Sequence, residues 1–513
     1  MGRVITNGTT LSFAREASLG TLPVEPQWFE TEPNNITSWG TTISKEARSP
    51  ISRARARRKG VVTDLDSAVE FEADLTLAHL RWFAEAFLFS NAVGADAFLV
   101  SGVTGTGYTI PALSAAEAGR LVYNGAGSGA TTLIYASGFL NEANNGLKVL
   151  SDDPGATETE LTIAGLTAET VAAGNYAEIA VAGVRGAAGD IEIDADGNLI
   201  STALDFTTLG IAPYQVIHIG GVDLANQFFE EENTGFARAI LIEQNKITLA
   251  KRDQPFVADD GTDDNSGGTG LRIDILFGQF VRNVPVGAAD WVEHSTQFEL
   301  ASPNLMAGGA TGYEYSLGNY ADALSISIPL SGKATMTLGF VGTDTTNPSI
   351  VRAENAEDAK SGGQTESFGS ASDIARLRAQ DIDEEGLTTD FKSATFTLTN
   401  NVAGEKVIAK LGPKYLNIGD IEVDVETQIL FTNPDMIERI RCNRTVGLDW
   451  IIRNGDGGAA FDLPTGTLGG GGREMPENQS VLLNTTFMAH EEGAAGFTLG
   501  ISFFPVLPDV GCA

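Results

Sequence analysis

The fold class is decided most clearly at residues 324–340, which read LSISIPLSGKATMTLGF. Apolar side chains fill nearly every second position on both sides of Ser331-Gly332, and the positions between them are mostly small or polar. A period of two is the signature of a strand with one buried face, and a Gly-containing pair between two such runs favours a tight turn. This stretch therefore predicts a β-hairpin that turns one face toward a core.

The same alternation recurs from one end of the chain to the other. It is clearest in four further runs, at residues 69–75, 394–398, 421–425 and 497–503. The 59 glycines supply the turns that so many strands need. We therefore predict a mainly all-β protein.

Two segments are predicted as helices. The first is a flanking α-helix over residues 77–88, where apolar side chains recur every three or four positions after Asp74, the expected N-cap. We expect this helix to pack on a sheet and to carry polar side chains on its other side, namely His79, Arg81 and Glu85. The second is a short helix near residues 372–381, after a Gly- and Ser-rich approach.

Length and composition set further limits. A chain of 513 residues, 42% of them apolar, is long enough for several cores, which predicts more than one domain. No run approaches the roughly 20 apolar residues that span a bilayer, and the first residues lack the apolar core of a signal peptide. We therefore expect a soluble protein that is made in a cytoplasm and does not insert into a membrane. The cysteines, Cys442 and Cys512, predict neither a zinc site nor a disulfide framework.

The charge balance is strongly acidic, since 67 acidic and 33 basic residues give a formal net charge of −34. Such a surface repels phosphate, so sequence-specific binding of DNA or RNA is not expected, although nucleic acid can pass nearby without binding. A group of basic residues nevertheless falls within a few positions: Arg53, Arg55, Arg57, Arg58 and Lys59. Such a run is either a solvated loop or a contact with an acidic partner, which another copy of the chain would provide.

The composition shifts near residues 92 and 285, and the stretch between them behaves like an insertion. Its first part is rich in Ala, Gly and Thr and holds the turn Asn144-Asn145-Gly146, while its second part begins with another turn at 194–198. We predict a main domain whose first part is 1–92 and whose second part is 285–513, interrupted by two small β subdomains at 93–184 and 185–284.

No pattern in the chain points to catalysis. The four histidines lie in separate regions without paired spacing, and neither a P-loop nor a GxSxG nucleophile elbow occurs. Acidic turns such as residues 194–198 lack the twelve-residue EF-hand pattern, so backbone turn chemistry explains them more simply than calcium does. We therefore predict no enzymatic activity, no cofactor and no metal, although dispersed carboxylates leave a hydrolase open.

Several short patterns follow one another in order at the two ends of the chain. They are Arg15-Glu16, Gly20-Thr21-Leu22-Pro23, Ile43-Ser44-Lys45-Glu46, the basic run, the strand at 69–75 that leads into the helix, Tyr313-Glu314-Tyr315 with the 324–340 hairpin, the run 395–401, and Ala459-Ala460-Phe461-Asp462-Leu463-Pro464. Together they resemble the tail tube proteins of long-tailed, siphovirus-like bacteriophages. The resemblance covers roughly 1–92 and 285–513, and the inserted region resembles the decorative β domains that such proteins often carry.

This resemblance implies a β-sandwich with a flanking α-helix, in hexameric rings that stack into a tube. The partners would be other copies of the chain, other tail proteins at the tube ends, and DNA that passes through the lumen during ejection without specific binding. The protein would then be part of the virion tail. A rival interpretation is a virion or cell-surface protein that binds a receptor or carbohydrate, because the glycine-rich loops of the inserted region would suit that role too.

Two sets of residues are the candidate sites. The basic run, Arg53, Arg55, Arg57, Arg58 and Lys59, is predicted to form an extended arm that joins one ring to the next. The acidic strand faces are predicted to line a negative lumen, which would repel DNA rather than bind it. These faces comprise Glu70, Glu72, Asp74, Glu422, Asp424 and Glu426.

Overall fold

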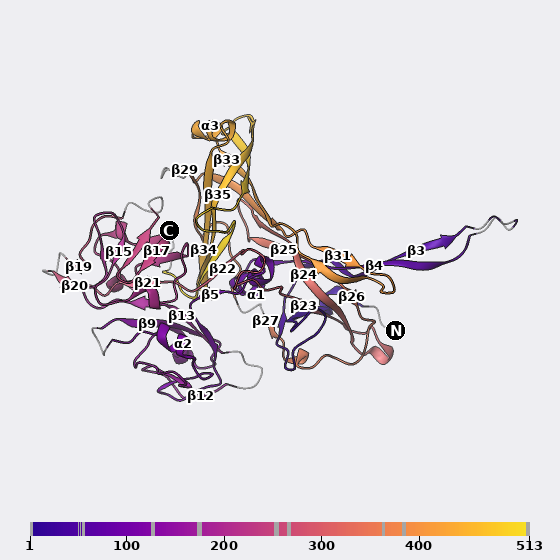
Figure 1. Cartoon of the computed structure of the whole chain (residues 1–513), viewed down its shortest axis with the longest axis horizontal. Helices are drawn as coiled ribbons and strands as arrows, with labels where there is room; N and C mark the ends of the chain where they lie inside the picture. The colour runs from indigo at the N-terminus through magenta and orange to yellow at the C-terminus, as the bar shows by residue number, and fades with distance from the viewer. Residues whose placement is uncertain are drawn as a thin grey trace.

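The computed structural model describes residues 4–508 apart from 50, 52, 54–56, 125–128, 172–176, 251–255, 264–267, 362–364 and 382–385. Figure 1 shows a central body, a long hairpin that leaves it on the right, a tall ribbon of strands at the top and a mass of short strands at the left. Antiparallel strands dominate all of these parts, so the prediction of a mainly all-β protein is confirmed.

The body is built on a run of antiparallel strands that pair edge to edge. In spatial order the run comprises β3 (Asn35–Arg48), β4 (Arg58–Asp74), β25 (Thr335–Gly342), β24 (Gly312–Ile328), β30 (Phe391–Thr399), β33 (Glu422–Leu430), β36 (Leu482–Ala489), β35 (Gly457–Glu474), β34 (Thr445–Asn454), β28 (Ile374–Asp381) and β29 (Gly386–Thr388). The helix α3 (Asp435–Arg441) lies at the top of the tall ribbon (Figure 1).

Further strands branch from this run. The long strand β24 also pairs with β23 (Thr296–Ser302) and β26 (Asp344–Thr345), and from β23 the pairing continues through β1 (Thr10–Arg15), β2 (Trp28–Glu30) and β27 (Lys360–Ser361). From β35 it continues through β37 (Gly500–Phe504), β22 (Gln279–Arg282) and β5 (Val93–Gly94). A separate hairpin is formed by β31 (Ala403–Lys406) and β32 (Pro413–Asn417).

The hairpin predicted at residues 324–340 is confirmed as β24 and β25. Leu324 pairs with Leu338, and both side chains are buried. Ser325 pairs with Thr337 on the opposite face, where both are partly exposed. The strands predicted at 69–75, 394–398 and 421–425 correspond to β4, β30 and β33, except that Leu75 and Ile421 lie one residue outside β4 and β33. Only the second half of 497–503 is a strand, because β37 begins at Gly500.

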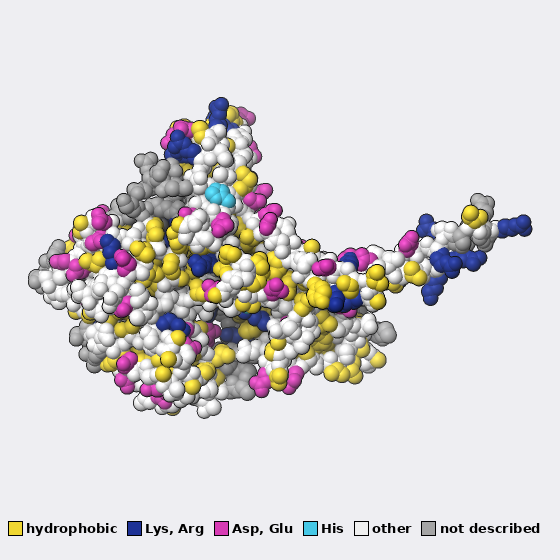
Figure 2. Space-filling view, viewed as in Figure 1, with side chains coloured by type: hydrophobic (Ala, Val, Ile, Leu, Met, Phe, Trp, Pro, Cys, Tyr) yellow, Lys and Arg dark blue, Asp and Glu magenta, His cyan; other side chains and the backbone are white. Residues whose placement is uncertain are grey.

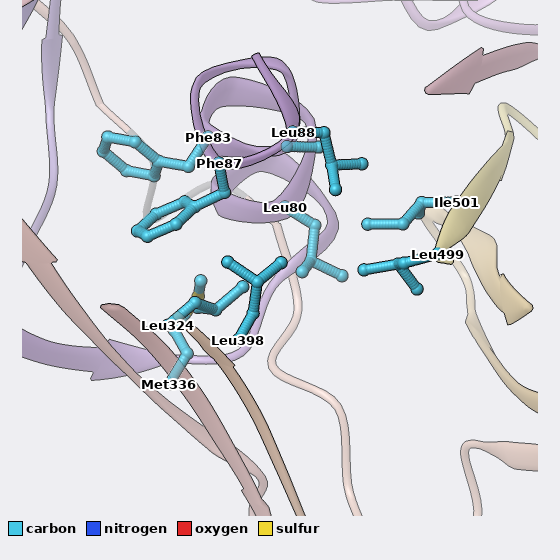
Figure 3. A pocket seen from close by; sticks show the side chains of 10 residues that line it. Leu80, Phe83, Phe87, Leu88, Leu324, Met336, Leu398, Leu499 and Ile501 are labelled. Carbon is cyan, nitrogen blue, oxygen red and sulfur yellow. The ribbon is translucent and has the colours of Figure 1, made fainter. Parts of the chain in front are cut away.

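The flanking helix is confirmed as α1 (Leu77–Leu88), and it packs on the sheet. Figure 3 shows how its apolar side chains meet those of two sets of strands. From the helix come Leu80, Phe83, Phe87 and Leu88, from the sheet come Leu324, Met336 and Leu398, and from the C-terminal segment come Leu499 and Ile501. This contact closes the main hydrophobic cluster, in which each buried leucine contributes about 1.5–3 kcal/mol.

The start of α1 differs from the prediction. Asp74 is the last residue of β4, where it pairs with Thr335, and the N-cap is Thr76, whose Oγ1 accepts a hydrogen bond from the His79 N–H at 3.2 Å. Because Asp74 is still paired with Thr335 in the sheet, it does not cap the first turn of α1. His79 was expected on the polar side, but it is 3% exposed, and its Nε2 lies 2.9 Å from the Thr31 carbonyl oxygen.

The short helix predicted at residues 372–381 is wrong, because this segment forms strand β28 on β34. Its polar residues follow a period of two, which places Arg376, Arg378 and Gln380 on one face. All three donate hydrogen bonds to the carboxylate of Asp449, which is 3% exposed. A buried carboxylate on the neighbouring strand therefore holds the segment extended, and that partner lies far along the sequence.

Residues 95–277 form a side unit with its own hydrophobic cluster, seen at the left of Figure 1. Within the described residues it contains α2 (Ala115–Arg120) and the strands β6 (Ala97–Leu99), β7 (Gly102–Val103), β8 (Gly107–Thr109), β9 (Thr131–Ser137), β10 (Gly146–Val149), β11 (Glu160–Thr162), β12 (Glu169–Thr170), β13 (Glu178–Arg185), β14 (Glu192–Ile193), β15 (Leu199–Ile200), β16 (Val216–Ile219), β17 (Gly235–Glu243), β18 (Lys246–Leu249), β19 (Thr262–Asp263), β20 (Thr269–Gly270) and β21 (Asp274–Leu276). Its largest sheet crosses the 184/185 boundary through the pairing of β13 with β21. The division of the chain into four parts stays a prediction.

A buried ion pair fastens the side unit to the body. Arg238 on β17 reaches Asp462 on β35, with Nε 2.6 Å from Oδ2, and the two side chains are 7% and 1% exposed. Phe236 packs on Phe504 in the same junction. Asp462 also lies opposite Asp449 on the paired strands β35 and β34. Two buried carboxylates thus face each other, and their arginine partners offset the repulsion.

We predict that Arg238→Ala lowers the free energy of unfolding by about 3–5 kcal/mol, because it leaves the buried Asp462 carboxylate without its guanidinium. The matched control is Arg444→Ala, whose side chain and its partner Glu438 are 50% and 59% exposed; this change should cost less than about 1 kcal/mol. Urea unfolding monitored by tryptophan fluorescence measures both. Equal losses in the two variants would contradict the prediction.

Candidate functional site

One face of the body sheet carries all of the acidic residues singled out from the sequence. In the run β4, β25, β24, β30 and β33, Glu72 lies in one row with Thr337, Ser325, Thr397 and Asp424. Residues directly opposite each other on antiparallel strands share a face. The structure therefore brings Glu72 and Asp424, which are far apart in sequence, to the same side of the sheet.

The rows on either side repeat this arrangement. One runs from Glu70 through Gly339, Ala323 and Thr399 to Glu422, and the other from Asp74 through Thr335, Ser327 and Thr395 to Glu426. Two columns of three carboxylates thus border three strands that are lined mainly by Ser and Thr. With strands about 4.8 Å apart, the two columns lie roughly 19 Å from each other. We call this surface, made of these three rows, the polar face.

The polar face is open to water in the single chain. Glu422 and Glu426 are exposed, and the other four carboxylates are partly exposed. The opposite face of the same strands is the core, because Phe71, Leu338 and Phe396 are each no more than 2% exposed. The sheet therefore separates a hydrophobic layer from a solvated layer of hydroxyls and carboxylates.

The two acidic columns differ in their electrostatics. Desolvation raises the pKa of the Asp424 carboxyl, and the neighbouring charges of Glu422 and Glu426 raise it further. For Asp74, partial burial pushes the pKa upward, but hydrogen bonds from Lys333 and Asn34 outweigh this effect, so its pKa is lowered. The column on β33 is therefore a stretch of mutually repelling charges, whereas the column on β4 has a cation at one end.

The predicted basic arm lies at the tip of the β3–β4 hairpin. This hairpin extends away from the body on the right of Figure 1, and Figure 2 shows Lys and Arg side chains gathered at its end. Arg53, Arg57, Arg58 and Lys59 are all exposed there. Arg55 lies outside the described residues. We call β3, β4 and the described residues between them the arm.

The base of the arm is held to the body by an ion-pair cluster. Nζ of Lys406, on the β31–β32 hairpin, lies 2.7 Å from Asp64 and 2.6 Å from Asp66. Both aspartates belong to β4, so the short hairpin is joined to the strand that continues into the arm. The sequence held no signal for this contact, because Lys406 and Asp64 are far apart along the chain.

The groups considered for metal or acid–base chemistry occupy separate places. His218 is buried, which lowers its pKa to about 4, and its Nδ1 lies 2.9 Å from the Gly220 carbonyl oxygen. Asp194 accepts hydrogen bonds from the N–H groups of Asp196 and Asn198, as an acidic turn does. Over the described residues, no three His, Cys, Asp or Glu side chains form a group that could hold a metal ion.

The described part of the chain contains no helix that is both long and apolar enough to cross a membrane. A family model described as phage tail tube protein matches residues 6–489. No curated protein matches the chain. The matched range begins before β1, ends with β36 and includes the side unit.

We predict that the double variant Glu422→Gln and Glu426→Gln lowers the pKa of Asp424, since it removes the neighbouring negative charges. Because the folded pKa is raised, the contribution of Asp424 to stability is full below the ordinary aspartate pKa and is lost as the pH rises through the raised value. The double variant should weaken that loss. Carboxyl ¹³C shifts of labelled aspartate, followed from pH 3 to 7, measure the pKa.

The control for this titration is Glu70→Gln with Glu72→Gln, on the column roughly 19 Å away across the sheet. Those changes should leave Asp424 nearly unaffected, because water and salt screen charges over such a distance. An equal shift in both double variants would show that the effect is not local to β33.

Proposed function

The chain belongs to the phage tail tube protein family, and we propose that its copies form hexameric rings that stack into a tube around a negatively charged lumen. DNA would pass through this lumen during ejection. As a tail tube protein the chain is a structural component of the virion tail and assembles with itself and with other tail proteins. We propose that these other proteins meet it at the tube ends and that it is made in the host cytoplasm.

The polar face is the observation that carries the proposed lumen. It presents two columns of carboxylates and a band of hydroxyls on the solvated side of the sheet. Carboxylates repel phosphate and so cannot bind the DNA backbone, while the hydroxyls offer only neutral hydrogen bonds through water. A wall of this composition would let DNA slide without a preferred resting position.

The like charges on β33 also favour a water-filled location. Adjacent carboxylates on one strand face destabilise it unless they are well solvated. Partial burial is the main cause of the raised pKa of Asp424, and repulsion from Glu422 and Glu426 raises this pKa further. Burial of this face against another protein would remove the water and increase the cost. An open channel keeps the charges hydrated, and therefore fits the face better than a dry interface between subunits does.

The arm supports the proposed stacking of rings. A strand of 14 residues such as β3 spans roughly 45 Å, of which the outer part leaves the body. Its basic tip requires an acidic partner, and each copy of this chain carries a net charge of −34. We propose that Arg53, Arg57, Arg58 and Lys59, together with Arg55, reach the next ring and bridge two surfaces that would otherwise repel.

We further propose that the protein is not an enzyme and that it uses no cofactor or metal. Negative-stain microscopy of the purified chain separates this function from its rivals. Rings and tubes would support it, whereas monomers that bind glycans would favour a receptor- or carbohydrate-binding protein. Monomers that turn over a substrate would favour a hydrolase.

We predict that reversing the charge of the polar face slows or arrests DNA ejection. The variant changes Glu70, Glu72, Glu422, Asp424 and Glu426 to Lys, while Asp74 is kept because it pairs with Lys333. DNA should then bind the wall through its phosphates. Release of DNA from triggered virions, followed with an intercalating dye, measures the effect.

The control changes five exposed carboxylates of the side unit to Lys, with the same change in net charge: Glu142, Asp153, Glu230, Glu231 and Glu232. Virions with this control should eject at the normal rate. Normal ejection by assembled virions of both variants would place the polar face outside the lumen.

For the arm, we predict that Arg53→Ser, Arg57→Ser and Arg58→Ser together give a folded protein that forms short tubes or single rings. Each exposed ion pair contributes only about 0–1 kcal/mol, but several repeated around a ring add up. About 1 M salt should shorten the tubes of the unmodified chain in the same way, because the Debye length falls to about 3 Å. Electron microscopy measures the tube lengths.

The control for the arm removes three basic side chains outside it, with Lys148→Ser, Arg441→Ser and Arg444→Ser. Arg441 and Arg444 are exposed at the far end of the tall ribbon, and Lys148, which is partly exposed, lies on β10 of the side unit. Tubes of normal length are expected from this control. Full-length tubes from the arm variant at every salt concentration would indicate that the basic run is only a solvated loop.

A further inference from the structure

The β31–β32 hairpin is held firmly against the base of the arm. Its inner residue Leu416 is 7% exposed and packs with Phe89 and Tyr320. Gly412 has a φ of +83°, and a Cβ there would lie 2.9 Å from both a side-chain carbon of Leu65 and the carbonyl oxygen of Thr343. The short hairpin is therefore closely seated on the body, in addition to the ion pairs of Lys406.

The outer side of the same hairpin is apolar and open to water. Ile408 is 101% exposed, Leu411 44% and Tyr415 51%. The adjoining part of the arm adds Val61, which is 63% exposed. Exposed apolar side chains that cluster on a protein surface are typical of an interaction site.

These two groups of residues form one surface. Lys406, directly before the tip of the hairpin, bonds to Asp64 on β4. Asp64 pairs with Ser44 and Val61 pairs with Glu46, so Val61 and Asp64 lie on the same face of the arm. In Figure 1, β31 lies alongside the strands of the arm, and Figure 2 shows hydrophobic side chains in the same place. We define the apolar surface as Val61, Val407, Ile408, Leu411 and Tyr415.

The charges around the apolar surface limit what can cover it. Lys410 and Lys414 are exposed on the hairpin, and the Nζ of Lys414 lies 4.9 Å from the centre of the Tyr415 ring. The exposed carboxylates of Glu46, Asp66 and Glu405 lie on the strands that carry the same surface. A rim of both signs fits a protein partner, whereas an anionic lipid surface would be repelled by the carboxylates.

We propose that the apolar surface binds a second copy of this chain and is an assembly contact distinct from the basic tip. The inference rests on the proposed function, because the arm reaches a neighbouring copy there. The apolar surface adjoins the arm. A copy that contacts the basic tip of the arm would therefore also lie along the β31–β32 hairpin. The acidic surface of that copy complements Lys410 and Lys414, and its apolar groups replace the water on Ile408 and Leu411.

The test removes the two aliphatic side chains at the hairpin tip, with Ile408→Ser and Leu411→Ser in one variant. The matched control is Leu140→Ser with Leu224→Ser, which are 83% and 84% exposed in the side unit. Burial of two such side chains predicts that the tip variant needs at least about tenfold more protein to assemble. The control should assemble like the unmodified chain, and circular dichroism should show that all three are folded.

The readout is the concentration at which assembly begins, from sedimentation and electron microscopy. If the unmodified chain and the tip variant assemble at the same concentration, the inference is overturned while the proposed function stands. If the unmodified chain forms no tubes but dimerises through the apolar surface, the proposed function fails and the inference stands. If the unmodified chain stays monomeric throughout, both fail.

A photo-crosslinking amino acid at position 408 identifies the occupant directly. A crosslinked product of two copies of the chain is expected under assembly conditions. Absence of this product from assembled tubes would overturn the proposal. Flotation with vesicles of phosphatidylcholine and phosphatidylglycerol, lost in the tip variant, would assign the surface to lipid instead.

Discussion

The alternation of side chains along paired strands is the constraint on which the other features depend. Successive side chains of a strand point to opposite faces, so each residue that fills the core fixes a neighbour on the outer side. Leu324 and Leu338 enter the hydrophobic cluster only because Ser325 and Thr337 face water. A shift of one residue in the pairing of β4 with β25 would bury Glu72 and expose Phe71. The core and the polar face are therefore two results of one register.

Two acidic side chains face the interior, where most inward-facing side chains are apolar, and arginine side chains compensate for their charge. Asp449 and Asp462 face each other on paired strands inside the protein, where an unpaired carboxylate costs several kcal/mol. Each is met by arginine from another element, Asp449 from β28 and Asp462 from the side unit. The side unit thus supplies a counter-charge to the body. The side unit therefore neutralises a buried charge of the body, although its own hydrophobic cluster is separate.

The sequence predicts what depends on local pattern and misses what depends on distant partners. The 324–340 hairpin, the strand before α1 and the helix itself follow from periodicity, and the structure confirms them. The predicted helix at 372–381 is wrong because the carboxylate that holds it extended, Asp449, lies on another strand. The six acidic residues could be found one strand at a time. That they share one face follows only from the register of five strands, which no single segment contains.

The placement of basic residues explains how so acidic a chain can associate with itself. Several arginines pair with buried carboxylates, as Arg185 does with Asp274 and Arg238 with Asp462, so they contribute little charge to the outer surface. The outer surface is then left with an excess of carboxylates, and two such surfaces repel at close range. The exposed cations of the basic run are concentrated at the tip of the arm, where the chain extends furthest from its own body. A contact made at such a distance meets the acidic surface of another copy before it meets its own, and this favours association between copies over folding back onto the same one.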